Sequence, residues 1–256
     1  DTPLLADPTP PGQSQLPAGI IEINRENWMM VTTTKDLRPQ TSRLVKAEAG
    51  KGNWETVPDS ERDAAYAGGR QTQISGYYDP IPTADSERGW VYIVANNFDR
   101  SGPAVLYRAT PQTFTDRSAW QGWTGTTWGG EPAPLWPDKV GEMSVRQIDG
   151  MTMLSYFNAT TGNMEIRVAN DPTQLGTAPM TTVVVAAPWS APGWMKRSGK
   201  YVGDCWQQQN QLRDDMVEVY ARYYVRYLQA YAAEGVDVAQ VSLGNEPQHC
   251  NSTYPT

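Results

Sequence analysis

The feature that most limits the fold of this 256-residue chain is a hairpin pattern that occurs three times. The clearest copy lies within residues 141–172, where runs of alternating apolar and polar residues are separated by Asp149-Gly150 and then by residues 158–162. An Asp-Gly pair between such runs is a strong hairpin signal, because glycine accepts the positive φ of a type I′ turn. The pattern predicts three short strands: 144–148, 151–157 and 164–169.

The same pattern recurs twice upstream. Residues 90–97 (WVYIVANN) lead after a turn into 104–109 (AVLYRA), and residues 28–34 (WMMVTTT) lead into 42–46 (SRLVK). The copies begin about sixty residues apart, a spacing typical of antiparallel repeat modules such as propeller blades. We therefore predict that residues 18–187 form a mainly β domain of propeller-like repeats.

The last quarter of the chain has a different pattern. Residues 182–187 (TVVVAA) and 236–243 are apolar runs, and residues 211–234 between them carry tyrosines at helical spacing. Apolar strands without alternation are covered on both faces, as in a parallel sheet, and two of them joined by a helix form a βαβ unit. We predict such a segment in residues 188–256. Because a lone unit leaves strand edges unpaired, residues 183–185 are also predicted to pair with the last hairpin.

Composition excludes some classes of protein. The net charge is −7 and the pI is about 4.8, so phosphate-driven binding of nucleic acid is not expected. No apolar stretch is long enough to span a membrane. Ten Trp and thirteen Tyr against three Phe favour rings with an apolar face and a polar edge, which suit sugars, although β-sheets also use them.

The N-terminal residues 1–17 are rich in proline and are predicted to be a linker without a signal peptide. Cys205 and Cys250 are too few for a disulfide scaffold, and both a single bridge and two free thiols stay open. One His and two separated Cys give no zinc spacing. We therefore expect neither a metal nor a cofactor.

Three carboxylates of the β part are candidate catalytic groups, namely Asp79, Asp99 and Glu142. A glycosidase on a propeller needs two or three carboxylates at one mouth. The alternative is a structural role, above all for Asp99, because Asp36 occupies a similar position in another copy of the repeat.

Tyr78, Arg70 and Arg146 are candidate substrate-binding residues of the same part. The two arginines would pair with the carboxylates or, alternatively, satisfy loop carbonyls.

A second candidate site lies in the βαβ segment. Trp189 follows the first apolar strand and Glu246 ends the second, so a single βαβ unit places both on the same rim. A carboxylate beside the amide of Asn245 and a Trp platform suits a glycosidase acid/base. The alternative is that Glu246 caps a loop or forms an ion pair.

This segment resembles the family-30 glycoside hydrolases in residues 188–196 (PWSAPGWMK), in the Tyr-rich helix and in residues 244–247 (GNEP). That family includes glucosylceramidase-like and β-1,6-glucanase-like enzymes on a (β/α)₈ barrel. The resemblance implies that Glu246 is the acid/base and that Asn245 and Trp189 line the sugar subsite. The family's nucleophile is a second Glu on a later strand, outside the resembling segment, so another chain would complete the barrel.

Residues 18–187 resemble a different family, the actinobacterial endo-D-arabinanases, formerly a domain of unknown function. The resembling stretches are residues 19–23 (GIIEI), 30–36 (MVTTTKD), 68–80 (GGRQTQISGYYDP) and 141–146 (GEMSVR). The resemblance implies a β-propeller that acts on the D-arabinofuranosyl chains of cell-wall arabinan.

Together these patterns predict a secreted or cell-wall-associated glycoside hydrolase that cleaves within D-arabinan, with the polysaccharide as its partner. One alternative is a family-30-like retaining β-glycosidase that uses Glu246 as its acid/base. Another is a non-catalytic carbohydrate-binding module, or an incomplete fusion of two partial domains in which another chain completes the barrel or the propeller.

Overall fold

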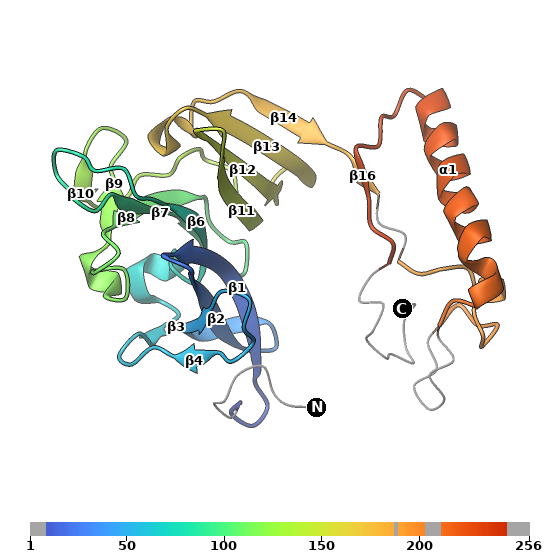
Figure 1. Ribbon diagram of the computed structural model, residues 1–256, viewed down its shortest axis with the longest axis horizontal. Helices are drawn as coiled ribbons and strands as arrows, with labels where there is room; N and C mark the ends of the chain where they lie inside the picture. Colours follow the sequence, from blue (N-terminus) through green and yellow to red (C-terminus); the bar gives the residue numbers. More distant parts are fainter. Residues whose placement is uncertain (1–8, 187–188, 203–210, 245–256) are drawn as a thin grey trace. The chain divides into compact units, whose positions relative to one another are not determined.

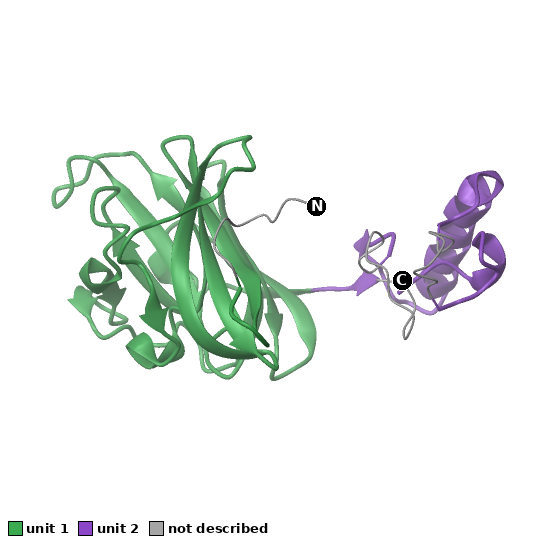
Figure 2. Ribbon diagram, turned by 90° about the horizontal axis from the view of Figure 1, so that it is seen from below, with its two compact units in different colours: residues 1–182 green, residues 183–256 purple. Residues whose placement is uncertain are grey.

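The computed structural model describes residues 9–186, 189–202 and 211–244. The chain divides into two compact units, Asp1–Thr182 and Val183–Thr256 (Figure 2). The first unit is built of antiparallel β-sheets, and the second contains the long helix.

The first unit contains three antiparallel sheets whose strands mostly follow one another in sequence (Figure 1). The first sheet comprises β1 (Ser14–Ile23), β2 (Glu26–Lys35), β3 (Arg38–Glu48), β4 (Glu55–Thr56) and β5 (Arg62–Asp63). The second comprises β6 (Gln73–Asp79), β7 (Trp90–Asn96), β8 (Val105–Ala109), β9 (Gln121–Trp123) and β10 (Trp128–Gly130). The third comprises β11 (Val140–Ile148), β12 (Met151–Asn158), β13 (Asn163–Ala169) and β14 (Met180–Val183). Short 3₁₀ turns lie between successive strands: η1 (Tyr66–Gly69) between β5 and β6, η2 (Arg117–Ala119) between β8 and β9, and η3 (Pro172–Gln174) between β13 and β14.

The predicted hairpins are confirmed. All three copies of the pattern form antiparallel strands, and the turn between β11 and β12 has φ of 50° at Asp149 and 79° at Gly150. The first unit is therefore mainly β and antiparallel, as the alternation of the sequence predicts.

The three sheets meet through their edge strands β1, β6 and β11 (Figure 1). Gly19 on β1 has a φ of 107°, and a Cβ at this position would lie 1.5 Å from the carbonyl oxygen of Ile74 on β6. On the other side of β6, the amide of Val145 on β11 donates to Ser75 Oγ at 2.9 Å. Only glycine permits the first of these approaches.

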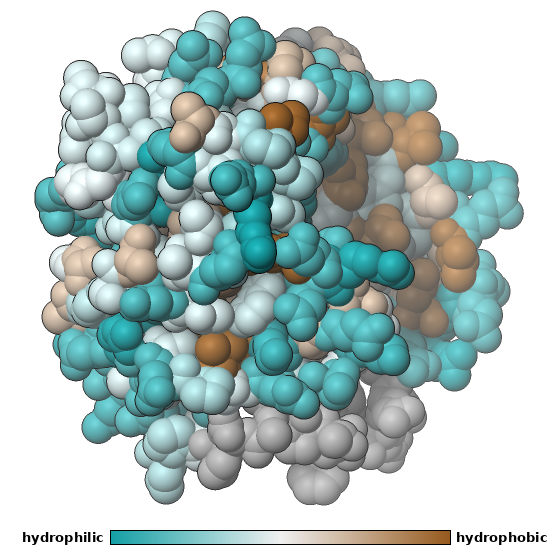
Figure 3. Space-filling view, turned by 60° about the vertical axis from the view of Figure 1, so that its left-hand side comes forward, coloured by the Kyte–Doolittle hydropathy of each residue, from teal (hydrophilic) through white to brown (hydrophobic). Residues whose placement is uncertain are grey.

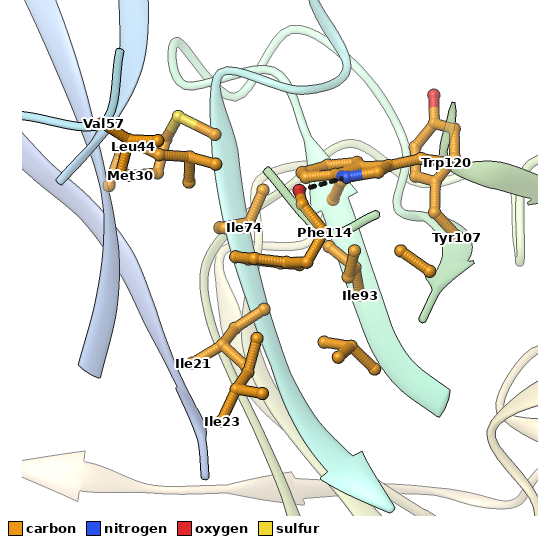
Figure 4. Packing of buried hydrophobic residues seen from close by; sticks show 14 of the residues in the cluster. Ile21, Ile23, Met30, Leu44, Val57, Ile74, Ile93, Tyr107, Phe114 and Trp120 are labelled. Carbon is orange, nitrogen blue, oxygen red and sulfur yellow. Dashed lines mark hydrogen bonds between the residues drawn. The ribbon is translucent and has the colours of Figure 1, made fainter. Parts of the chain in front are cut away.

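Two apolar cores hold the sheets together. Residues of the first and second sheets form one core, in which Ile21, Met30 and Leu44 face Ile74 and Ile93 (Figure 4). The indole of Trp120 in this core donates to the carbonyl of Phe114 at 2.8 Å. A second core joins the second and third sheets and includes Val94, Leu106, Val145, Leu154 and Tyr156.

A buried arginine also links the first two sheets. Arg117 is 1% exposed, and its guanidinium donates to the carbonyl of Ser42 on β3 at 3.0 Å and to that of Gln71 at 2.9 Å. Burial lowers the pKa of Arg117 to about 10, so the side chain remains charged at neutral pH. The charge is tolerated because its donors meet protein acceptors.

The second unit comprises β15 (Val185–Ala186), η4 (Gly193–Met195), η5 (Asp214–Met216), α1 (Val217–Ala233) and β16 (Gln240–Val241). Strands β15 and β16 are parallel and are connected through α1. Tyr220 and Tyr224 of the helix are buried, and their hydroxyls lie 2.9 Å apart. The rest of the barrel that the resemblance implies is not among the described residues, and no described helix has the length and apolar character of a membrane span.

Two expectations for this region need correction. The helix begins at Val217, later than predicted, because Asp214–Met216 form a 3₁₀ turn, and it ends before Gly235, whose φ is 80°. The strand that joins the third sheet is Met180–Val183, whereas Val185 pairs with Gln240. The predicted pairing of residues 183–185 with the last hairpin is therefore right only at Val183.

The packing of β1 on β6 gives a direct prediction. Replacing Gly19 with Ala is expected to destabilise the first unit by more than about 4 kcal/mol, because the new methyl group overlaps a backbone carbonyl. Urea denaturation followed by Trp fluorescence measures this. Gly52→Ala is the control, since no atom lies within 4 Å of its Cβ; equal effects of the two substitutions would contradict the role of Gly19.

Arg117 gives a second prediction. Arg117→Met keeps much of the side-chain volume but removes every donor, so we expect a loss of about 2–4 kcal/mol in the free energy of unfolding. The exposed Arg88 serves as the control, and Arg88→Met should change stability by less than about 0.5 kcal/mol. A stable Arg117→Met protein would show that apolar packing alone joins the two sheets.

Candidate active site

An open cavity of about 490 Å³ lies where the three edge strands end. Its lining comes from the last residues of β1, β6 and β11, together with one residue of β2: Ile20, Glu22, Asn27, Gly76, Tyr77, Tyr78, Arg146 and Gln147. The face of the first unit that Figure 3 shows is mostly polar, with hydrophobic residues scattered over it.

Strand alternation explains which side chains reach the cavity. Ile21 and Ile23 of β1 are buried in the core, so Glu22 between them points the other way and is exposed. On β11, Val145 is buried and Arg146 is exposed. Tyr78 is held in place by its hydroxyl, which donates to the carbonyl of Arg88 at 2.8 Å.

The charged groups of the cavity are not paired with each other. Among the described residues, neither Glu22 nor Arg146 forms an ion pair, and Arg146 donates to the carbonyl of Val145 at 2.7 Å. An arginine has five donors. The cavity therefore offers a carboxylate and a guanidinium to a ligand.

The three predicted carboxylates lie at two different ends of the second sheet. Asp79 follows Tyr78 at the cavity end, and its Oδ1 accepts a hydrogen bond from the amide of Ile81 at 3.0 Å. In the antiparallel pair of β6 and β7, Asp79 is opposite Trp90, and Asp99 comes after the far end of β7. Six residues of extended strand separate the two ends by about 20 Å.

Asp99 and Glu142 occupy the far end together. Asp99 Oδ1 accepts from the amide of Ser101 at 3.1 Å, which is the turn role that the sequence left open. Glu142 forms an ion pair with Arg100, whose Nε lies 2.9 Å from Glu142 Oε1. Both carboxylates are thus engaged in local contacts.

Arg70 belongs to the same far end, because it precedes β6. It forms an ion pair with Glu131 at 2.8 Å and donates to the carbonyl of Pro132 at 3.3 Å. Of the two predicted alternatives, Arg70 satisfies a loop carbonyl; its ion pair is with Glu131, which is not one of the three candidate carboxylates. Of the predicted binding residues of the first unit, Tyr78 and Arg146 line the cavity and Arg70 does not.

The second unit has a cavity of its own, of about 440 Å³. Its lining includes Trp189, Lys196, Tyr220, Tyr224 and Gly244. Burial lowers the pKa of Lys196, whose Nζ donates to the carbonyl of Tyr201 at 2.9 Å.

Four predicted residues lie outside the described residues, namely Glu246, Asn245, Cys205 and Cys250. In the described part of the chain, no cluster of three or more His, Cys, Asp or Glu side chains could hold a metal.

Glu22 is the charged residue of the cavity that the sequence analysis missed. Its stretch, residues 19–23, carries the family resemblance, but a single charge between two isoleucines also fits any exposed position of a strand. The available signal was the alternation itself, which places Glu22 opposite the core. Its meeting with Tyr78 and Arg146 depends on contacts between strands far apart in the sequence.

A row of aromatic rings continues from the cavity. Tyr77 lines the cavity, and its ring centroid lies 5.5 Å from that of Tyr92. Tyr92 lies 6.1 Å from Trp128, which lies 5.1 Å from Trp123. We call these four residues the aromatic row. They belong to four strands of the second sheet.

A stacked arginine holds Trp128 of this row in place. The guanidinium of Arg108 lies 3.8 Å from the ring centroid of Trp90 and 4.7 Å from that of Trp128. It forms an ion pair with Asp85 at 2.5 Å and donates to Gln121 at 2.9 Å. Stacking of the planar guanidinium on the rings and its contacts with Asp85 and Gln121 favour one orientation of Arg108.

The fold and the cavity define a class of protein: a mainly β, antiparallel domain with an open polar cavity between its edge strands. The chain belongs to the family of domains of unknown function DUF4185, whose pattern matches residues 7–233. It is 71% identical over 194 residues to the "Uncharacterized 35.9 kDa protein in asd 3'region" of Mycolicibacterium smegmatis. That match covers 75% of this chain and 58% of the relative, so the chain spans little more than half of the relative's length.

More distant similarities are to glycoside hydrolases. An endo-1,6-β-D-glucanase of Neurospora crassa is 31% identical over 108 residues, which are 42% of this chain and 22% of that protein. Among solved structures, an α-L-arabinofuranosidase of Fusarium graminearum has a TM-score of 0.38 at 15% identity, covering 66% of this chain and 48% of that one. An exo-β-1,3-galactanase of Phanerochaete chrysosporium has a TM-score of 0.39 at 10% identity, covering 68% and 35%. At these TM-scores the structural likeness does not define a function.

The Asp85–Arg108 contact predicts a pH dependence. The hydrogen bond from Thr83 and, after it, the contact with Arg108 hold the pKa of Asp85 below its ordinary value of 3.8. Folding thus favours the ionised form, so this contribution to stability is present above pH 3.8 and is lost as the pH falls through the lower folded-state pKa.

Carboxyl NMR titration measures this pKa directly. Thr83→Val and Arg108→Met are each expected to raise the pKa of Asp85, because the hydrogen bond from Thr83 and the contact with Arg108 both lower it. The exposed Glu87 provides a control, and Glu87→Gln should leave the titration of Asp85 unchanged. A titration midpoint at or above 3.8 in the unmodified protein would contradict the assigned contacts.

Proposed function

We propose that the first unit is a glycoside hydrolase that cleaves within D-arabinan, and that the cavity at the ends of β1, β6 and β11 is its active site. One observation carries the proposal. Three strands from three sheets bring Glu22, Tyr78 and Arg146 into one open polar cavity of about 490 Å³. The resemblance of residues 18–187 to endo-D-arabinanases supports both the choice of substrate and the type of reaction.

Hydrolysis of a glycosidic bond requires two carboxyl groups on either side of it. We assign these roles to Glu22, which lines the cavity, and to Asp79, which follows the cavity residue Tyr78. One group gives its proton to the leaving glycosidic oxygen as the bond to the anomeric carbon breaks. The other takes a proton from the water whose oxygen bonds to that carbon, so charge and atoms balance.

Arg146 and Tyr78 position the sugar in this proposal. The guanidinium of Arg146 donates to sugar hydroxyls, and the ring of Tyr78, fixed by Arg88, limits the orientation of the sugar. The polymer lies outside the cell, so we propose a secreted or cell-wall-associated location, with the polysaccharide as the partner.

The test compares Glu22→Gln and Asp79→Asn with the unmodified protein on D-arabinan. Each substitution is expected to lower kcat by about 10²–10⁴-fold, the usual contribution of a general acid or base. Release of reducing ends measures the rate, and circular dichroism checks the fold. Glu55→Gln is the control, because Glu55 is an exposed residue of β4 in the same sheet as Glu22 and should leave kcat unchanged.

Other outcomes would assign the activity elsewhere. Loss of activity in Asp99→Asn or Glu142→Gln, with full activity in Glu22→Gln, would place the reacting bond at the far end of the sheet. Binding of D-arabinan without any cleavage would make the unit a carbohydrate-binding module.

A second candidate function rests on the cavity of the second unit. Trp189 is 51% exposed there, and Gly244, the neighbour of Asn245, also lines the cavity. A family-30-like retaining β-glycosidase using Glu246 as acid/base would act at this place, with a second chain supplying the nucleophile. Cleavage of a β-1,6-glucan that Glu246→Gln abolishes would support it.

A further inference from the structure

We infer that the three partly exposed rings of the aromatic row, Tyr92, Trp128 and Trp123, form an extended binding platform for a neutral polysaccharide chain, while the buried Tyr77 supports Tyr92 from the core. The inference builds on the proposed function, since the platform would hold the part of the chain that continues beyond the reacting bond. Such a platform would give long polysaccharide chains a higher affinity than short oligosaccharides that fill only the cavity.

The row is continuous with the cavity. Tyr77 belongs to both, and each following ring centroid lies 5.1–6.1 Å from the previous one. The row leads from the edge strand β6 through Tyr92 on β7 to Trp128 and Trp123 on β10 and β9, the outermost strands of the second sheet. Tyr77 itself is 8% exposed and its hydroxyl lies 2.7 Å from Thr152 Oγ1, so it anchors the row in the core, and the rings open to a polysaccharide chain are Tyr92, Trp128 and Trp123.

The outer three rings differ from the core aromatics of the same unit. Trp120, Trp136 and Tyr156 are 7%, 6% and 0% exposed. Tyr92, Trp123 and Trp128 are instead only partly buried, and each packs against the core that joins the second and third sheets. Each of these rings thus has one side in the core and another part in contact with solvent.

Their polar edges are also unused. Within the described part of the chain, the hydroxyl of Tyr92 and the indole N–H groups of Trp123 and Trp128 make no hydrogen bond, and none of these atoms is buried. The buried indole of Trp120, by comparison, donates to Phe114. Half-exposed rings with free polar edges suit a sugar, whose C–H face stacks on the ring while its hydroxyls meet the edge.

The stacked arginine makes the platform rigid before a ligand binds. Arg108 is 9% exposed and lies between Trp90 and Trp128, so the ring of Trp128 is supported from one side. A ring that is already fixed loses little side-chain entropy on binding.

The nearby charges favour a neutral polymer. Burial is the main cause that raises the pKa of Tyr92; the carboxylates Asp171, Asp79 and Asp85 raise it further, and the guanidinium of Arg108 lowers it. Because Arg108 is paired with Asp85, the charge around this ring is net negative. Like charges repel, so a chain of uronic acids would be disfavoured there. Arabinan carries no charge and meets no such penalty.

The test uses Trp128→Ala and Trp123→Ala in the full chain. Each is expected to raise KM for polymeric D-arabinan about tenfold, as the loss of one stacking contact predicts, with kcat nearly unchanged. KM for a short arabino-oligosaccharide that fills only the cavity should change less than about twofold. Equal effects on both substrates, or none on either, would overturn the platform.

Controls separate loss of stacking from loss of folding. Trp128→Phe keeps a ring and should restore most of the affinity, and near-UV circular dichroism checks the packing of each variant. Trp54 is a partly buried Trp of the first unit outside the row, so Trp54→Ala should leave KM unchanged. If Trp54→Ala raised KM as much as Trp128→Ala, the effect would not belong to the row.

A binding measurement keeps this inference apart from the proposed function. Affinity electrophoresis of the Glu22→Gln protein in gels containing soluble D-arabinan should show retardation, which a further Trp128→Ala substitution removes. Retardation of the unmodified protein that is not accompanied by any hydrolysis of D-arabinan would support the platform and reject the proposed reaction. Retardation by polygalacturonate that equals that by arabinan would contradict the preference for a neutral chain.

Discussion

The first unit depends on how closely its edge strands approach one another. At Gly19 the space for a side chain is taken by the carbonyl of Ile74, and the register of β1 shifts between Pro17 and Ile20 around this contact. Strand β11 has a similar shift between Gly141 and Ser144 where it packs on β6. These irregularities allow the edge strands of three sheets to pack against one another. The packing in turn brings together the strand ends that line the cavity.

Apolar burial alone does not specify this arrangement, because similar cores would tolerate sliding of one sheet on another. Polar contacts between sheets supply the register. Arg117 donates to Ser42 in the first sheet and to Gln71 just before the second, and Ser75 accepts from Val145 of the third. A shift of any sheet would leave these buried groups without partners, at a cost of about 1–3 kcal/mol for each neutral group and more for the charged Arg117.

Local signals predicted the hairpins but not the site. The Asp149-Gly150 turn and the alternation around it depend only on neighbouring residues, and the structure confirms them. Asp79 and Asp99 were both candidate catalytic carboxylates, yet the antiparallel order of β6 and β7 places them at opposite ends of the second sheet. Glu22 could be found only with the contacts between β1, β6 and β11 known. The late start of α1 reflects a 3₁₀ turn that helical periodicity does not distinguish from a helix.

Independent features favour the same end of the sheets. At the far end, Glu142 is paired with Arg100 and Arg70 with Glu131, whereas Asp79 and Asp99 do not differ in this respect, because each accepts a hydrogen bond from the amide two residues later. At the cavity end, Glu22 and Arg146 form no ion pair among the described residues, and the aromatic row begins there at Tyr77. The paired charges of the far end have already lost part of their bound water to protein partners, whereas Glu22 and Arg146 form no ion pair with any described residue and remain hydrated. A ligand can replace water on Glu22 and Arg146 without first breaking an ion pair, which favours binding at the ends of β1, β6 and β11.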